Sequence, residues 1–208
     1  MPVVAFDALE WHSAAMPGSN GPVELARLPQ QDDHALRAFV RFPAGWSRPG
    51  AGHYMVPEEF LILDGDLSLN GITWETGGYA WIPALRVRSG THSGIGCLAF
   101  AWFGGVPRWI TGEPATVVMG CDVRFTHWRA APETSSGSGA YALRADPEHS
   151  TWIIEPSTSQ PVALPDEAWE TLRLHDNTWS WKDAVDPVIE CPGLLLVRAQ
   201  SAFASAMR

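Results

Sequence analysis

The side chains best suited to chemistry lie in residues 37–65, where a histidine, two glutamates and a turn sequence follow one another closely. An apolar run ends in a turn, and the loop after that turn contains His53. A second apolar run begins at Glu58 and ends at Asp64-Gly65, a dipeptide typical of hairpin turns. Imidazole and carboxylate groups are side chains that bind metal ions or transfer protons. We therefore predict that two strands position a functional site here.

The order of these residues resembles the first motif of the cupins, which are small β-barrels of the jelly-roll type. That motif contains a His-x-His pair, followed at short spacing by a glutamate and then by a glycine. His53 falls on the position of the second histidine, Glu58 on the glutamate and Gly65 on the glycine. The position of the first histidine is occupied by Ala51.

A second cupin motif is also recognisable, in which Gly78 and Pro83 match the family and Arg88 replaces the expected histidine. Two of the four expected metal ligands are therefore missing. The resemblance covers roughly residues 20–105, and within the cupins it is similar to the ChrR-like group, which includes anti-sigma-factor domains. The segments that carry this narrower resemblance are 42–46, 57–67, 77–83 and 94–97.

The cupin resemblance implies a transition-metal site built from imidazole and carboxylate groups on neighbouring strands. His53 and Glu58 would supply two ligands, and His92 would supply a third if an insertion remodels the second motif. The implied metal is a divalent iron, zinc, manganese or nickel ion. This arrangement would leave coordination positions open for a substrate.

Arg88 gives an alternative, because a guanidinium group stays protonated and repels a divalent cation. It would then pair with Glu58, or hold the carboxylate or phosphate of a ligand through two hydrogen bonds. Tryptophans in the predicted strands would give the barrel an aromatic wall suited to a flat or apolar ligand, although core packing explains them equally well. The residues predicted to contact the ligand are Arg88, Trp81, Tyr54, Phe60 and Trp46.

The charge and cysteine content exclude several classes of function. The 208-residue chain has a formal net charge of −9 and no basic run, which argues against binding to nucleic acid. Three scattered cysteines indicate neither a disulfide framework nor a thiolate zinc site, so a reducing cytoplasm is the expected location. The sequence shows no signal-peptide pattern and no apolar run of ~20 residues, and we expect no membrane association.

The composition favours an all-β fold, because 11 tryptophans, 19 glycines and 17 prolines accompany short apolar runs. We predict a cupin-type jelly-roll barrel over residues 1–110 and a second, degenerate cupin-like β half over residues 111–208. Residues 128–154 repeat the order of residues 11–40: a tryptophan, small residues, a turn, a strand, an acidic-histidine turn and an apolar strand. The chain thus resembles a degenerate bicupin, with irregular β-structure in the second half as the alternative.

Local patterns predict individual elements. Asn70-Gly71 is typical of a type I′ hairpin turn between two short alternating strands. The apolar run 97–102 is consistent with a strand buried on both faces or with a short helix, and the flanking glycines favour the strand. Further strands are expected at 178–182 and 194–197.

Two classes of function follow. The first is a small-molecule-binding cupin with an incomplete metal motif and a pocket lined by arginine and aromatic side chains. The second is a metal-dependent enzyme, a dioxygenase or isomerase that acts on a small organic acid or diketone. A regulatory partner of the anti-sigma-factor type is a third class, weakened by the absence of an added helical segment. A homodimer is expected, because cupins commonly pair through their barrels.

Overall fold

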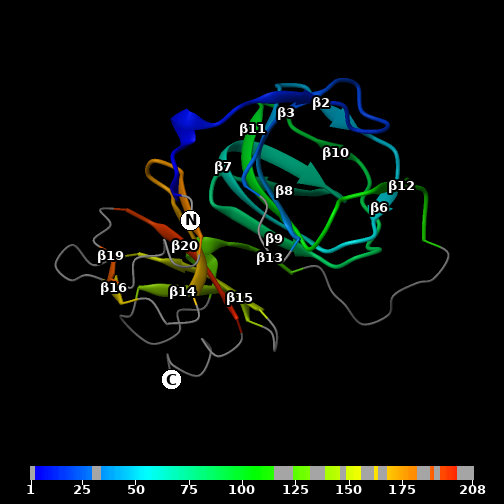
Figure 1. Cartoon of the computed structure of the whole chain (residues 1–208). Helices are drawn as coiled ribbons and strands as arrows, with labels where there is room; N and C mark the ends of the chain where they lie inside the picture. Colours follow the sequence, from blue (N-terminus) through cyan, green and yellow to red (C-terminus); the bar gives the residue numbers. More distant parts are fainter. Residues whose placement is uncertain are drawn as a thin grey trace. The chain divides into compact units, whose positions relative to one another are not determined.

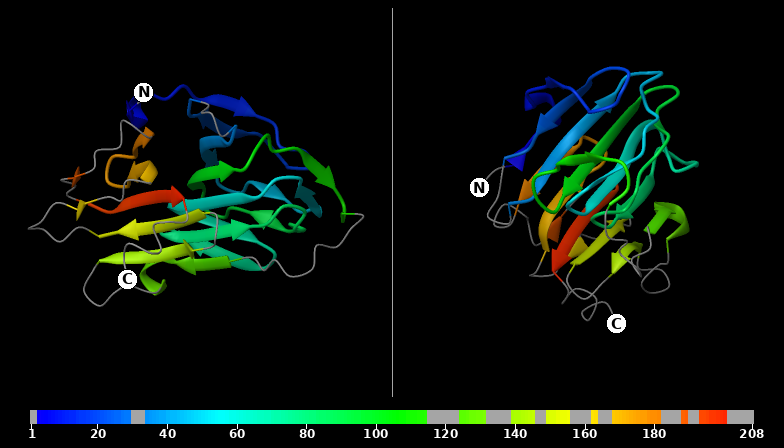
Figure 2. Two further views of the ribbon diagram at one scale, coloured as in Figure 1. Left: turned by 60° about the horizontal axis from the view of Figure 1, so that its bottom comes forward. Right: turned by 90° about the vertical axis from the view of Figure 1, so that its right-hand side faces the viewer.

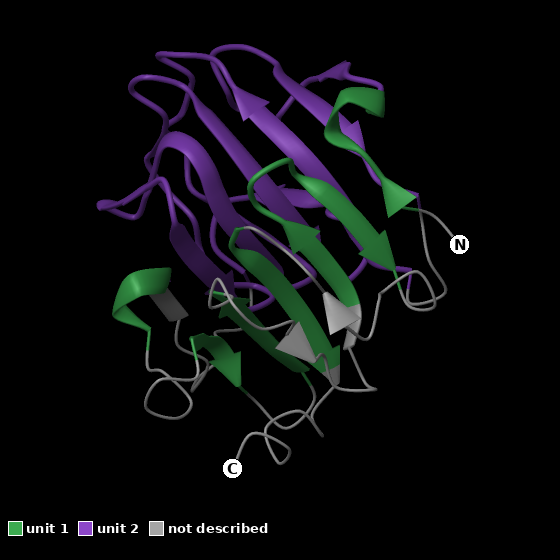
Figure 3. Ribbon diagram, turned by 90° about the vertical axis from the view of Figure 1, so that its left-hand side faces the viewer, with its two compact units in different colours: residues 1–9, 128–208 green, residues 10–127 purple. Residues whose placement is uncertain are grey.

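The computed structural model describes residues 3–29, 34–114, 124–131, 139–145, 149–155, 162–163, 168–181, 188–189 and 193–200. The chain forms two compact units, which Figure 3 shows in different colours. Residues 10–127 are called the barrel unit, and residues 1–9 together with 128–208 are called the second unit.

The barrel unit is built from short antiparallel strands joined by turns (Figure 1). They are β2 (His12–Ala14), β3 (Val23–Arg27), β4 (Leu36–Phe42), β5 (Ser47–Arg48), β6 (Gly52–Tyr54), β7 (Glu58–Leu69), β8 (Ile72–Glu75), β9 (Gly78–Ile82), β10 (Thr91–His92), β11 (Cys97–Phe103), β12 (Trp109–Thr111) and β13 (Arg124–His127). The unit extends beyond the predicted boundary at residue 110, because β12 pairs with β6 and β13 pairs with β9.

One layer of the barrel unit has the strand order β13-β9-β7-β11-β4-β3-β2. Figure 2 shows these strands side by side, from blue β3 and β4 to green β11. The second half of β7 pairs instead with β8 and β10, and β10 pairs with β5. The long strand β7 therefore takes part in both layers, as expected for a jelly roll, and it places its first residues beside the core of the barrel.

A β-bulge in β7 exchanges the faces of the strand. Leu98 pairs with Asp64 and Ala99 pairs with Ile62, so one extra residue lies on β7 between these two pairs. Inward-facing positions are therefore Phe60 and Ile62 before the bulge, but Leu67 and Leu69 after it. The prediction that Asp64-Gly65 forms a hairpin is wrong, because the strand bends there and continues to Leu69.

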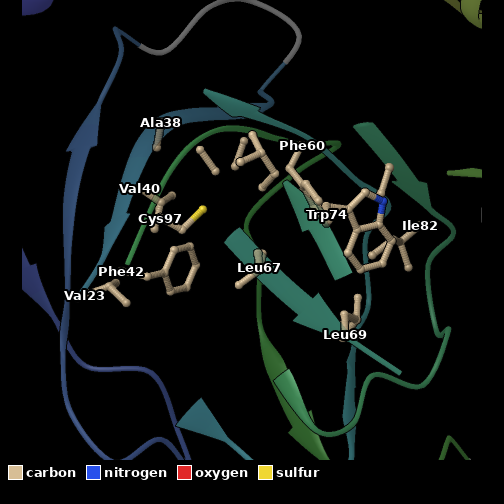
Figure 4. Close-up of a cluster of buried hydrophobic side chains, with 14 of the residues drawn as sticks. Val23, Ala38, Val40, Phe42, Phe60, Leu67, Leu69, Trp74, Ile82 and Cys97 are labelled. Atoms are coloured by element: carbon tan, nitrogen blue, oxygen red, sulfur yellow. The ribbon is translucent and has the colours of Figure 1, made fainter. Parts of the chain in front are cut away.

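The apolar core of the barrel unit lies between the two layers. Val40 and Phe42 from β4 and Leu67 and Leu69 from β7 point into the interior, as Figure 4 shows. All four side chains are buried. Burial of each stabilises the fold by about 1.5 to 3 kcal/mol, which holds the surrounding strands in a fixed register.

The second unit contains a six-stranded sheet in the order β1-β18-β17-β20-β15-β14, and β16 pairs with β19. Its elements are β1 (Val3–Val4), η1 (Phe6–Ala8), η2 (Trp128–Ala130), β14 (Ala140–Ala145), β15 (His149–Ile154), β16 (Val162–Ala163), β17 (Ala168–Arg173), β18 (Thr178–Trp181), β19 (Val188–Ile189) and β20 (Leu195–Gln200). A buried ion pair joins two of these strands, since Arg198 Nη1 donates to Glu170 Oε2 over 2.7 Å. The predicted bicupin relationship between the halves stays a prediction.

The all-β prediction is confirmed. In the described parts of the chain, the only helical segments are the short 3-10 turns η1 and η2. None of the described helical segments has the length or hydropathy to cross a bilayer.

Candidate functional site

A cavity of about 260 Å³ lies inside the barrel unit. Its wall is mostly apolar, and the small side chains of Ala99 and Ala101 on β11 leave space that larger residues would fill. The apolar lining consists of Ala14, Ala15, Met16, Pro17, Val23, Leu25, Leu36, Val40, Phe42, Trp46, Phe60, Leu67, Leu69, Ala99, Ala101, Phe103, Pro107 and Trp109. The polar lining consists of Arg27, Arg48, Tyr54, Glu58, Arg88 and Thr91.

Strand pairing explains why Arg48 and Thr91 reach the same cavity. They are partners in the antiparallel pair of β5 and β10, so their side chains lie on the same face. Arg88 lies in a loop that forms an isolated bridge with Gly52 at the start of β6. The segments that contribute the polar groups are thus fixed by backbone hydrogen bonds, which hold the groups in place before any ligand arrives.

Arg88 and Glu58 form an ion pair in the wall of the cavity. Arg88 Nε donates to Glu58 Oε2 over 3.1 Å, and Arg88 Nη2 lies 3.1 Å from the same oxygen. Arg88 Nη1 donates to the carbonyl oxygen of Arg86 over 3.0 Å. Burial lowers the pKa of Arg88, and the nearby Glu58 carboxylate opposes that shift. Despite these contacts, the buried Nη2 makes no hydrogen bond to a described residue.

Arg48 has no carboxylate partner among the described residues. Its Cζ lies 3.6 Å from the centroid of the Trp109 ring, a cation–π contact, and its Nη1 makes a long hydrogen bond of 3.4 Å to the Tyr54 hydroxyl. Its buried Nε has no hydrogen-bond partner in the described structure, and the same holds for the hydroxyl of Thr91. Arg48 is therefore a buried cation whose charge is not neutralised by any acidic side chain that the structure describes.

Tyr54 stands beside both arginines. Arg88 Cζ lies 4.8 Å and Arg48 Cζ 5.9 Å from the centroid of its ring, while Phe103 and Trp109 contact the ring edge-to-face. Burial raises the pKa of Tyr54, and the Glu58 carboxylate adds to the increase, although both arginines act against it. The phenol is therefore neutral near pH 7 and does not compensate the charge of Arg48.

The cavity brings together most of the predicted ligand-binding residues: Arg88, Tyr54, Phe60 and Trp46 all line it. Trp81 does not. Phe60 pairs with Ala80, and both belong to the core, so the neighbouring Trp81 lies on the opposite face of β9.

The three predicted metal ligands are not brought together. Of these, only Glu58 lines the cavity. His53 precedes the inward-facing Tyr54 on β6, and its Nδ1 lies 3.1 Å from the carbonyl oxygen of Gly112. His92 follows the inward-facing Thr91 and is exposed. No group of three His, Cys, Asp or Glu side chains suited to a metal occurs among the described residues.

The residues around Glu58 do not fit the metal that the cupin resemblance implies. Glu58 is the only described carboxylate in the lining, which has no imidazole or thiolate, and its Oε2 is bound by Arg88. Borderline metals need several such donors that converge at short distances. The site instead combines cationic and aromatic side chains with an otherwise mostly apolar wall.

Sequence reasoning missed Arg48, Thr91 and Trp109. A signal existed for Arg48, because it is a cation within the first cupin-like motif, five residues before His53. Its role depends on pairing with β10 and on contact with Trp109, both distant in the sequence.

The chain was compared with known proteins by sequence and by structure. No protein-family model and no curated protein matches the sequence. A proposed dioxygenase from Nostoc punctiforme is similar in structure, with a TM-score of 0.70 at 16% identity over 95% of this chain and 81% of that one. YlbA from E. coli has a TM-score of 0.56 at 12% identity, over 97% of this chain and 86% of that one.

Vicilin from hazelnut, Corylus avellana, also has a TM-score of 0.56, at 11% identity, and the match covers 96% of this chain and 85% of that chain. At these identities the similarity shows the fold alone. The narrower resemblance to ChrR-like cupins stays a prediction. The strand order of the barrel unit, its two motifs and these structural matches identify the chain as a protein of the cupin fold.

Proposed function

We propose that the barrel unit binds a small organic anion in its cavity, and that it does so without a metal ion. One observation carries this proposal: Arg48 and Thr91 line the cavity beside the Arg88–Glu58 pair, and the buried Arg48 Nε and Thr91 hydroxyl make no hydrogen bond to a described residue. The exposed fractions of Arg48, Arg88 and Thr91 are 5%, 1% and 6%, so bulk solvent is largely kept from them.

An anion is the ligand that these donors favour. A buried donor without an acceptor costs about 1 to 3 kcal/mol, and more when the group is charged. A carboxylate or phosphate group would supply acceptor oxygens to the planar guanidinium groups, which match such oxygens in geometry. Binding would thus supply acceptors to the Arg48 Nε and Thr91 hydroxyl donors, which have none among the described residues.

A dioxygenase is the alternative suggested by the description of the Nostoc punctiforme protein, and the cupin resemblance implies that such an enzyme would depend on a metal. That chemistry needs a set of metal ligands, and the described lining of this cavity offers the single carboxylate of Glu58, already paired with Arg88. The side chains that line the cavity therefore favour binding of an anion through charge and hydrogen bonds over metal-dependent chemistry.

The test is thermal unfolding of the full chain with acetate, benzoate, succinate or phosphate, each compared with chloride at equal ionic strength. An anion at 100 times its Kd adds about 2.7 kcal/mol of stability, roughly 5 to 10 °C in Tm for a chain of this size. The increase should disappear in Arg48→Gln and persist in Arg41→Gln, which removes an exposed arginine on the outer face of β4. If no anion raises the Tm above the chloride control, the proposal is wrong.

A further inference from the structure

We infer that the ligand is a monocarboxylate with an apolar body about the size of one ring. This inference rests on the anion-binding function proposed above and specifies its ligand class. It follows from the charge balance, the wall chemistry and the volume of the cavity.

The charge balance of the buried lining favours a single negative charge. The charge of Arg88 is matched by Glu58 at 3.1 Å, whereas Arg48 has no carboxylate partner among the described residues. Arg27, the remaining cation of the lining, is exposed to solvent and is therefore screened. A dianion would bring a second charge into the cavity, where the described lining offers no further free buried cation to pair with it, and burial of an unpaired charge is costly.

The buried donors of the cavity wall lie close to one another, around Tyr54. Both guanidinium groups flank the ring of this residue, and Thr91 is the cross-strand partner of Arg48. The planar carboxylate presents two acceptor oxygens, which suits the fork of a guanidinium group and a nearby hydroxyl. The neutral phenol of Tyr54 adds a further hydroxyl beside the two arginines.

Apart from the exposed Arg27, the described remainder of the wall is apolar and offers no group to bind a second polar part of the ligand. Val40, Phe42, Leu67 and Leu69 point into the interior in Figure 4, and all four line the cavity. A polar ligand body would lose its hydrogen bonds to water against this wall, whereas an apolar body gains about 25 cal/mol for each Å² removed from water.

The volume sets the size of that body. An apolar cavity of about 150 Å³ is sufficient for benzene. The cavity of about 260 Å³ therefore accommodates one ring together with its carboxylate. Benzoate is accordingly the first probe, and benzamide is its neutral counterpart of the same shape.

The test is isothermal titration of the full chain with benzoate, benzamide, phthalate, succinate, acetate and inorganic phosphate. We expect benzoate to bind with 1:1 stoichiometry, and benzamide, the two dianions and phosphate to bind at least ten times more weakly. Arg48→Gln should lower the affinity for benzoate at least tenfold, and Arg48→Lys should lower it by a smaller factor. The control Arg41→Gln changes an exposed arginine and should leave the affinity for benzoate unchanged. Circular dichroism checks that each variant is folded.

A second variant tests the apolar body separately from the charge. Ala101→Leu places a larger side chain in the cavity, so it should weaken benzoate at least tenfold while the smaller acetate keeps its affinity. If phosphate or succinate binds more tightly than benzoate and requires Arg48, the anion site stands and the monocarboxylate class is wrong. If no probe shows binding that depends on Arg48, both the ligand class and the proposed function fail.

Discussion

Arg88 and Glu58 are joined through one carboxylate oxygen, Glu58 Oε2, which lies 3.1 Å from both Nε and Nη2 of the arginine. In the resemblance to the cupins, Glu58 stands at the position of a metal-binding glutamate and Arg88 stands at the position of a metal-binding histidine. The guanidinium group of Arg88 supplies the positive charge beside the Glu58 carboxylate. The pair therefore stabilises the wall of the cavity and leaves Arg48 as the cation available to a ligand.

Replacement of Glu58 should destabilise the protein. In Glu58→Gln the buried Arg88 loses its neutralising charge, and we expect the free energy of unfolding to fall by about 1 to 3 kcal/mol. The measurement is urea denaturation followed by tryptophan fluorescence. Glu24→Gln is the matched control, because Glu24 pairs with Arg41 at the surface and should contribute less than about 1 kcal/mol. Equal losses in the two variants would show that the Arg88–Glu58 pair has no special role.

The purified, tag-free protein should contain no stoichiometric iron, zinc, manganese or nickel, even after growth in metal-supplemented medium. The reason is that His53 and His92 do not line the cavity and Glu58 is paired with Arg88. Inductively coupled plasma mass spectrometry measures the content, with His53→Ala as the comparison. About one metal ion per chain that disappears in His53→Ala would contradict this prediction and favour the enzyme hypothesis.

Stability should fall in alkaline solution because of Cys97. Burial raises the pKa of this thiol to about 12, with Asp66 and Asp64 adding to the increase. The folded state therefore retains a proton that the unfolded chain releases above about pH 9, so the free energy of unfolding decreases as the pH rises from about 9 towards 12. Between about pH 8 and 10 the expected loss is about 1.4 kcal/mol.

Urea denaturation of the wild type and of Cys97→Ala at the two pH values isolates this thiol from the other titrating groups. The variant should lose less stability than the wild type on going to the higher pH. Parallel losses in the two proteins would mean that Cys97 is not the responsible group.

Two glycines with similar backbone angles should differ in their tolerance of alanine. Gly65 has φ +79° at the bend of β7, and a Cβ there would overlap the carbonyl oxygen of Gly96. Gly71 has φ +77° in the β7–β8 hairpin turn, where the space around a Cβ is open. Gly71→Ala should cost about 1 kcal/mol from backbone strain, and Gly65→Ala about 1 to 3 kcal/mol more because of the overlap. Thermal unfolding of both variants tests this prediction. Similar Tm values for Gly65→Ala and Gly71→Ala would show that the bend of β7 does not require glycine more strictly than the hairpin turn does.

Strands with strong local signals were predictable. The run at 97–102 became β11, and Asn70-Gly71 became the hairpin turn between β7 and β8, with positive φ at both residues. Strands expected near 178 and 195 became β18 and β20. These predictions succeed because apolar runs and turn residues act within a few positions of the chain.

The site was predictable only in part. The sequence alone determined that Glu58 and Arg88 stand at motif positions of a cupin-like barrel, since motif spacing is a local property. It did not determine which face of a short strand points inward. Tyr54 and Thr91 line the cavity, whereas their neighbours His53 and His92 do not.

Only the tertiary structure decided those faces, because they follow from the register of β6 with β12 and of β10 with β5, which depends on pairing between distant segments. A shift of one residue exchanges every inward and outward side chain of a strand. The same long-range pairing brings Arg48 from β5 beside Trp109 from β12, and an arginine in a turn-rich stretch becomes a buried cation of the cavity wall with no carboxylate partner among the described residues.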